Sequence, residues 1–280
     1  MTLPAHWVNL VPGTGLDVGD RGFAYGDGVF ETLRCHRGRV HLWEYHWQRL
    51  QRGLDCLGIA CSREQVEAQL ELGKAHLLDT GIEDAVARLA VSRGSGKRGY
   101  RPSGGEPTLV LSLNEASAWG SETPPLTVAV CETRIAHQPQ LAGIKHANRL
   151  EQVLAAAELG SLEVDEGLQL DMSGRLVCAT AANLFVGIDG ILLTPPLEQC
   201  GVAGTVRQLI IDELAPAADI PLQVSPIEPA DLARAEELFL TNAVFGIRPV
   251  LRCGQHSFTS TRWGDTLRSH FHRWSDTHAW

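Results

Sequence analysis

Several segments of the chain repeat apolar residues at helical spacing. One helix is expected from about Trp43 to Leu57, because Gly58 supplies the residue type that commonly ends a helix. Ser62 and Gln65 have the spacing of a capping box, and the helix that they predict ends at Gly81. The first half of the chain therefore contains two helices of ordinary length.

A further amphipathic helix is expected from about Asn148 to Leu159, since four apolar residues share one face there: Leu150, Val153, Leu154 and Ala157. Asn148 is expected to cap this helix, and Glu151 to complete a capping box. Lys145 would then lie just before the first turn, near the positive end of the helix dipole. A positive neighbourhood disfavours the ammonium form, and Schiff-base chemistry requires the neutral amine. On the spacing alone, an ordinary surface lysine is the favoured interpretation of Lys145.

Strand patterns lie between these helices. In the first half, strands are expected at 29–35, 85–92 and 107–114. The second half contains two hairpin patterns, at 168–180 and at 183–194, and in the latter Asp189-Gly190 separates two apolar runs. A helix from Thr205 to Leu214 follows. Hairpins beside segregated helices predict an α+β fold, not a doubly wound parallel sheet.

A stretch containing serines, a glycine and two prolines, over 115–125, is the best candidate for a linker. It divides the chain into a small N-terminal domain over 1–115, a linker over 116–125 and a larger, cofactor-binding C-terminal domain over 126–280. At 280 residues the chain has enough apolar material for both cores.

Composition narrows the classes of function. The net charge is −9 and no basic cluster is present, so a nucleic-acid partner is not expected. No apolar run approaches membrane-spanning length, and the first residues do not resemble a signal peptide. The seven cysteines are odd in number and form no CxxC pair, which favours free thiols in the cytoplasm and no metal site.

One group of motifs carries most of the functional information. Residues 144–152 read Ile-Lys-His-Ala-Asn-Arg-Leu-Glu-Gln, and residues 21–32 read Arg-Gly-Phe-Ala-Tyr-Gly-Asp-Gly-Val-Phe-Glu-Thr. Further motifs follow at 92–100, 181–185 and 201–207. Together they resemble the fold-type IV pyridoxal-phosphate family, which includes branched-chain and D-amino acid aminotransferases. The match is strongest to its aminodeoxychorismate lyases, and it extends from about Asp20 to Pro249.

The resemblance implies a two-domain fold, with a small α/β domain and a larger domain built on a barrel-like mixed sheet. It implies that Lys145 is the catalytic residue and binds pyridoxal 5'-phosphate covalently. The other implied cofactor contacts are Arg49, Cys178, Thr205, Val206, Asn242 and Ala243. The implied substrate contacts are Phe30, Thr32, Arg93, Lys97, Arg98 and Tyr100, with Arg98 and Tyr100 holding a carboxylate and Arg93 and Lys97 steering the substrate.

One position departs from the family pattern. The family places a glutamate five residues before the asparagine of Asn183-Leu184-Phe185, where it pairs with the pyridine nitrogen of the cofactor. Here that position is Cys178, which is not a strong anion unless its pKa is lowered. Either another carboxylate or water reaches the nitrogen, or the ring works largely unprotonated.

The implied activity is conversion of 4-amino-4-deoxychorismate to 4-aminobenzoate and pyruvate, a step of folate biosynthesis, in a homodimer. Two alternatives remain: an aminotransferase of the same fold acting on D- or branched-chain amino acids, and a non-catalytic pyridoxal-phosphate-binding protein. A dinucleotide site is rejected. Residues 94–99 spell G-x-G-x-x-G, but Tyr100 to Gly105 cannot start the helix that such a site requires.

Overall fold

The computed structural model describes residues 3–102, 104–121 and 124–280. The chain forms two compact units, and each is discontinuous in sequence. Unit 1 comprises Met1–Ser121, Ile144–Asn148 and His278–Trp280, and unit 2 comprises Glu122–Gly143 and Arg149–Thr277. The continuous domain ranges expected from the sequence stay a prediction. They differ from these units at residues 144–148 and at the last three residues, which the prediction assigns to the second domain and which lie in unit 1.

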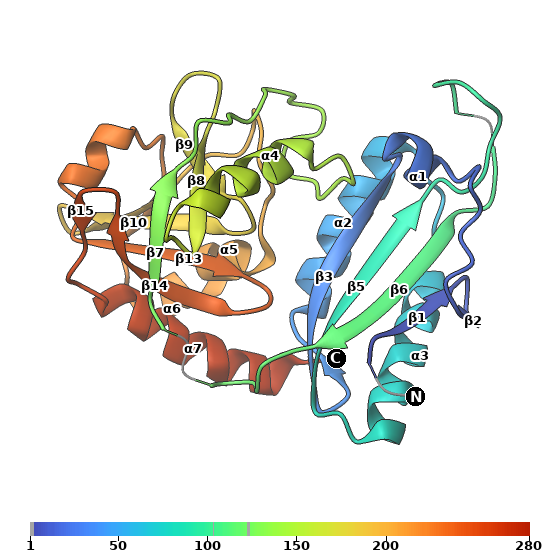
Figure 1. Cartoon of the computed structure of the whole chain (residues 1–280). Coiled ribbons are helices and arrows are strands. Elements are labelled where there is room, and N and C mark those ends of the chain that lie inside the picture. The colour runs from blue at the N-terminus through green and yellow to red at the C-terminus, as the bar shows by residue number, and fades with distance from the viewer. Residues whose placement is uncertain (1–2, 103, 122–123) are drawn as a thin grey trace. The chain divides into compact units, whose positions relative to one another are not determined.

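Unit 1 is built on a six-stranded antiparallel sheet of order β2-β1-β6-β5-β3-β4. Its strands are β1 (Ala5–Val8), β2 (Val11–Pro12), β3 (Gly28–His36), β4 (Arg39–Val40), β5 (Asp84–Ser92) and β6 (Thr108–Glu115). Its helices are α1 (Arg21–Tyr25), α2 (Trp43–Leu57) and α3 (Arg63–Thr80). Helices α2 and α3 cover one face of the sheet (Figure 1).

Alternation along β3 decides which side chains can reach a ligand. Val29, Leu33 and Cys35 point into the core beneath α2, so Phe30 and Thr32 lie on the opposite face of the sheet. No described helix of unit 1 packs on that face in Figure 1. One face of the sheet therefore packs against helices in an apolar core, and the other face carries Phe30 and Thr32.

Unit 2 is built on a mixed sheet, with parallel pairs β11·β12, β14·β7 and β7·β8 among antiparallel ones. Its strands are β7 (Leu126–Val130), β8 (Glu166–Leu170), β9 (Leu176–Ala179), β10 (Asn183–Ile188), β11 (Ile191–Thr194), β12 (Leu222–Val224), β13 (Glu237–Asn242), β14 (Gly246–Cys253) and β15 (His256–Ser257). Its helices are α4 (Leu150–Glu158), α5 (Thr205–Leu209), α6 (Ala215–Ala217) and α7 (Arg262–His278), with a π-helical turn at Ile210–Leu214 and 3-10 turns at Leu159–Ser161 and Pro229–Ala233.

The α+β expectation is confirmed, and so are several elements. Helix α2 ends at Gly58, which adopts the left-handed conformation, and α3 begins with the capping box of Ser62 and Gln65. The second hairpin turns at Asp189 and Gly190, both with positive φ. Local signals were sufficient for these elements, because each depends on residues close in sequence.

The expected cap of α4 is wrong. The helix begins at Leu150, and its N-cap is Arg149, without a side-chain bond to the helix. The Asn148 amide instead donates to the Gly26 carbonyl at 3.0 Å, and the Glu151 carboxylate accepts from the Ala136 amide at 2.9 Å. Both side chains are therefore used in longer-range contacts and not at the helix terminus.

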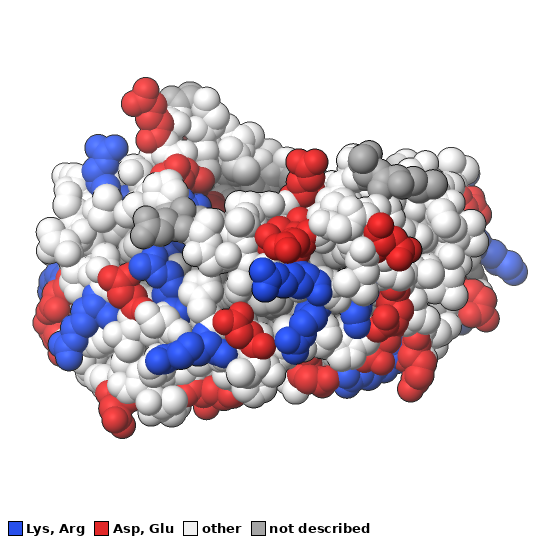
Figure 2. Space-filling model, turned by 90° about the horizontal axis from the view of Figure 1, so that it is seen from below, with Lys and Arg blue, Asp and Glu red and all other residues white. Residues whose placement is uncertain are grey.

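Two surface properties follow from the structure. On the face shown in Figure 2, Lys and Arg side chains are mixed with Asp and Glu among neutral residues. No described helix is both long and apolar enough to span a membrane.

Candidate active site

Lys145 lies at the edge of β3 in unit 1. The segment Ile144–Asn148 pairs with the beginning of this strand: the Phe30 amide donates to the Lys145 carbonyl, and the Ala147 amide donates to the Gly28 carbonyl, both at 2.9 Å. This pairing directs the Lys145 amine over the Phe30 ring, with Nζ 4.5 Å from the ring centroid. Strand pairing, rather than a helix terminus, therefore fixes the catalytic candidate.

Arg88 joins this group and was not among the residues expected from the sequence. It lies on β5 directly opposite Thr32 of β3, and its guanidinium carbon is 3.8 Å from the Phe30 ring centroid. Part of the side chain is exposed, but burial of the guanidinium lowers its pKa. In the described part of the chain Arg88 has no hydrogen-bond acceptor, so its planar fork is available for a carboxylate.

A buried ionic cluster lies on the other side of β3. Glu31 and His46 are fully buried, and Arg49 of α2 is 5% exposed. The Glu31 carboxylate accepts from Arg49 Nε at 2.8 Å and from His46 Nδ1 at 2.6 Å, and it also pairs with Arg49 Nη2. Burial alone would raise the pKa of Glu31, but Arg49 and His46 outweigh it and lower this pKa to about 2.

His46 is the neutral member of the cluster. Burial lowers its pKa despite the attraction of Glu31, and an ionised carboxylate cannot donate, so Nδ1 must carry the proton. The charge partner of Glu31 is thus Arg49. The expected role of Arg49 at a cofactor phosphate stays a prediction, since the structure gives its Nε and one Nη to Glu31.

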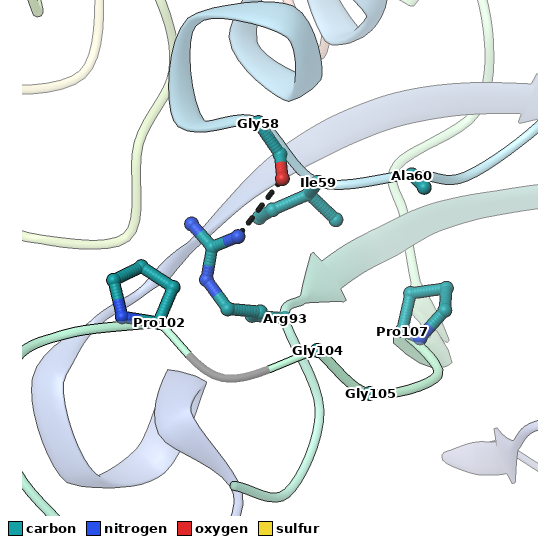
Figure 3. A pocket seen from close by; sticks show the side chains of 8 residues that line it. All are labelled: Gly58, Ile59, Ala60, Arg93, Pro102, Gly104, Gly105 and Pro107. Atoms are coloured by element: carbon teal, nitrogen blue, oxygen red, sulfur yellow. Dashed lines mark hydrogen bonds between the residues drawn. The ribbon is translucent and has the colours of Figure 1, made fainter.

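Arg93 is held inside unit 1. Its guanidinium donates twice to Asp27, at 2.8 and 3.1 Å, and to the carbonyls of Leu57 and Gly58. Figure 3 shows the Gly58 bond at one wall of a cavity of ≈ 150 Å³, which lies beneath the loop that follows β5. These bonds favour a structural role for Arg93 over the steering role expected from the sequence.

The loop residues expected to bind substrate are exposed. Lys97, Arg98 and Tyr100 all lie on the surface of unit 1, and Tyr100 is 86% exposed. No regular helix follows β5 as far as Arg101 and Pro102. The structure thus groups Lys145 with Phe30 and Thr32, while Arg98 and Tyr100 project from a separate loop.

Unit 2 contains a compact glycine turn at the start of α5. The N-cap is Gly204, without a side-chain bond to the helix, and a Cβ there would lie 1.9 Å from Asn183 Oδ1. The Thr205 hydroxyl is buried and has no hydrogen-bond partner among the described residues. A buried hydroxyl without a partner at a helix start suits an anion such as a phosphate. Val206, the next residue, is fully buried.

Asn242 and Ala243 form the turn that follows β13. The Asn242 side-chain oxygen accepts from the amides of Val244 and Phe245, both at 2.9 Å, and its amide group donates to the Ala181 carbonyl at 3.2 Å. The Asn242 side chain therefore shapes the turn, and cofactor contacts here would come from the backbone.

Cys178 lies on β9 in an apolar cluster with Ile135, Val177 and Cys200. Burial raises the pKa of its thiol to about 12, against a smaller opposing effect of Arg149. The thiol is therefore neutral at physiological pH. Within the described ranges no group of acidic, histidine and cysteine side chains could hold a metal ion.

Comparisons with known proteins identify the family of the chain. The family model for amino-transferase class IV matches residues 28–253. An aminodeoxychorismate lyase of Vibrio harveyi is 36% identical over 87% of this chain and 89% of its own length. A putative branched-chain-amino-acid aminotransferase of Methanocaldococcus jannaschii is 32% identical over 84% of this chain and 81% of its own length.

A solved structure gives the same result. The crystal structure of 4-amino-4-deoxychorismate lyase from Pseudomonas aeruginosa superposes with a TM-score of 0.88 and 38% identity, covering 96% of this chain and 98% of that one. The family match covers well over half of the chain and includes the strand that carries Phe30 and the segment that carries Lys145. The chain therefore belongs to the amino-transferase class IV family.

Proposed function

We propose that this chain is a pyridoxal-phosphate-dependent lyase that converts 4-amino-4-deoxychorismate to 4-aminobenzoate and pyruvate. The observation that carries the proposal is the grouping of an amine and a guanidinium on one aromatic ring, Lys145 and Arg88 on Phe30. The substrate carries an amino group and carboxylates, so this pair matches its chemistry. The lyase names of relatives at 36% and 38% identity support the same choice.

The residues of the chain fit the family cofactor. In unit 2, the buried Thr205 hydroxyl at the start of α5 lacks a described partner. This hydroxyl favours a phosphate at the helix start, near the amides of Thr205 and Val206. In unit 1, Lys145 would form the covalent link. When bound, pyridoxal phosphate supplies an electron sink for the carbanion that forms beside the substrate nitrogen.

The side chains of unit 1 supply the remaining steps. The Lys145 amine removes the proton from the ring carbon that bears nitrogen. The Arg88 guanidinium holds a substrate carboxylate through two parallel hydrogen bonds, which orients that carbon toward the amine. Thr32, opposite Arg88 in the sheet, or a water molecule would deliver a proton to the departing enolpyruvyl group. Loss of that group makes the ring aromatic.

Lys145→Ala tests the proposal directly. We expect loss of the visible absorption of the bound cofactor and a fall of about 10²–10⁴-fold in 4-aminobenzoate formation, the contribution typical of a positioned acid or base. Lys74→Ala is the matched control, since Lys74 pairs with Glu71 on α3 and should leave both readouts unchanged. Wild-type turnover in Lys145→Ala would refute the assignment.

The reaction product distinguishes the proposed lyase from an aminotransferase. A lyase releases pyruvate from aminodeoxychorismate, whereas an aminotransferase converts the cofactor to its amine form when D- or branched-chain amino acids are added. The neutral Cys178 disfavours the aminotransferase, because transamination depends more strongly on a protonated ring. A non-catalytic binding protein would bind the cofactor and give neither product.

We also propose a cytoplasmic homodimer. Helix α4 exposes three apolar side chains on one face, Leu150, Val153 and Leu154, at 75%, 58% and 58%. An exposed apolar face of this kind favours coverage by a protein partner, and the family resemblance makes a second copy the expected one. Sedimentation of the wild-type chain tests this, and a monomer at micromolar concentration would contradict it.

A further inference from the structure

One buried arginine supports the tip of the loop that follows β5. Arg21, the first residue of α1, is 3% exposed. Its Nη1 donates to the Gly99 carbonyl at 2.8 Å, and its Nη2 donates to the Tyr100 carbonyl at 2.9 Å. The guanidinium therefore binds the backbone of the loop and leaves the loop side chains turned outward.

The same arginine is connected to the base of the loop through one carboxylate. Arg21 Nε donates to Asp27 Oδ2 at 2.8 Å, and Arg93 Nε donates to the same oxygen at 2.8 Å. Burial would raise the pKa of Asp27, but the two arginines outweigh it and lower this pKa. A single ionised aspartate thus orients the cation beneath the tip and the cation at the base.

Tyr25 completes the support. Its hydroxyl accepts from the Gly99 amide at 3.1 Å, and its ring centroid lies 4.9 Å from the Arg21 guanidinium carbon. Gly99 has a φ of +107°, which residues with a Cβ rarely adopt. The conformation that presents the two carbonyls to Arg21 therefore depends on glycine at this position.

We propose that Arg21 and Asp27 are positioning residues that hold residues 97–101 preorganised for binding a substrate carboxylate through Arg98 and Tyr100. The identity of that substrate rests on the proposed function. A loop held through its backbone does not have to be ordered by the ligand, so the entropic cost of ordering falls on folding and not on binding. The shape of this loop would then depend on residues that do not touch the substrate.

Proteolysis of the cofactor-bound enzyme tests the support itself. Trypsin can cut after Lys97 and Arg98, both exposed. Arg21→Lys keeps a cation beside Asp27 but loses the fork that binds two carbonyls. We expect the cleavage rate to rise about tenfold, which corresponds to about 1.4 kcal/mol of local stability. Arg63→Lys, which alters an exposed ion pair with Glu44, is the control and should leave the rate unchanged.

Steady-state kinetics test the consequence for binding. In Arg21→Lys we expect KM to rise about tenfold, the same 1.4 kcal/mol, with kcat and the visible absorption of the cofactor unchanged. Unchanged protection from trypsin, or a fall in kcat at constant KM, would overturn the proposal. Should Arg21→Lys fail to fold, Tyr25→Phe removes only the acceptor for the Gly99 amide and must give the same pattern to a smaller extent.

The two proposals fail differently. If wild-type enzyme releases neither 4-aminobenzoate nor pyruvate, the proposed function is wrong, yet trypsin protection by Arg21 can still be measured. If wild-type turnover is present and Arg21→Lys is as protected as wild type, only the positioning role is refuted.

Discussion

Two buried strand positions, Glu31 in unit 1 and Cys178 in unit 2, differ in their surroundings. Glu31 on β3 is fully buried but ionised, because Arg49 and His46 donate to it. Cys178 on β9 is 7% exposed and neutral, and it packs among apolar side chains. A buried carboxylate persists where its donors are part of the fold. Where they are not, a small neutral side chain takes the position.

The carboxylates near Cys178 are already used for other bonds. Glu166 accepts from the Thr180 amide at 3.2 Å and from the Thr180 hydroxyl, and Glu151 accepts from the Ala136 amide at 2.9 Å. These bonds disfavour one alternative raised by the sequence, that another carboxylate replaces the missing one. The other two, a water at the pyridine nitrogen and a cofactor ring that works largely unprotonated, stay hypotheses.

Of the changes at these two positions, the loss of the Glu31 carboxylate should lower the free energy of unfolding most. Glu31→Gln leaves Arg49 without its charge partner in the core, so we expect the free energy of unfolding to fall by about 3–5 kcal/mol. Urea denaturation measures this. Glu44→Gln is the matched control, because its exposed pair with Arg63 contributes less than about 1 kcal/mol. Equal losses in the two variants would contradict the account of the cluster.

Protonation of Glu31 at low pH should lower the free energy of unfolding by slightly less than Glu31→Gln does. The Glu31 pKa is about 2 when folded and about 4.3 when unfolded. Its contribution of about 3 kcal/mol is therefore present above pH 4.3 and is lost as the pH falls toward 2. His46 adds to this loss below about pH 6.5, because the unfolded imidazole binds a proton that the buried one resists. Unfolding measured from pH 7 to pH 3 should show a much flatter profile in Glu31→Gln.

The Cys178 position should tolerate change best. Cys178→Ala removes one sulfur from an apolar cluster and breaks no ion pair, so we expect a loss of about 1 kcal/mol in the free energy of unfolding. Thermal unfolding of the same preparation with and without cofactor measures it. A loss as large as that of Glu31→Gln would show that Cys178 has a polar role that its surroundings do not indicate.

The elements that were predictable from the sequence are those with local causes. Helix α2 could be bounded because its apolar spacing and Gly58 are adjacent, and the hairpin at Asp189-Gly190 depends on two residues. The start of α4 could not be predicted, because the Asn148 side chain donates to the carbonyl of Gly26, 122 positions away in sequence. A local capping pattern cannot compete with a partner that only the tertiary fold supplies.

The candidate site divides in the same way. Lys145 could be proposed from the sequence because a nine-residue motif includes it. Arg88 carries no motif, and its importance depends on the register that places it beside Phe30 and Thr32. For Arg93 the motif predicts a substrate contact, but in the structure its guanidinium donates to Asp27 and to the Gly58 carbonyl. These contacts depend on strand register and on hydrogen-bond partners distant in sequence, which a local motif does not contain.

The short segment Ile144–Asn148 gives the chain an unusual connectivity, because it joins unit 1 although the residues on both sides of it belong to unit 2. A gene fragment ending at Ser121 would encode most of unit 1 but lack Lys145, the proposed catalytic residue. A fragment starting after that point would encode the amine without the strand on which it rests. Neither half could be inherited, swapped or duplicated as a working module, so recombination within this gene should preserve function only when both halves come from compatible parents.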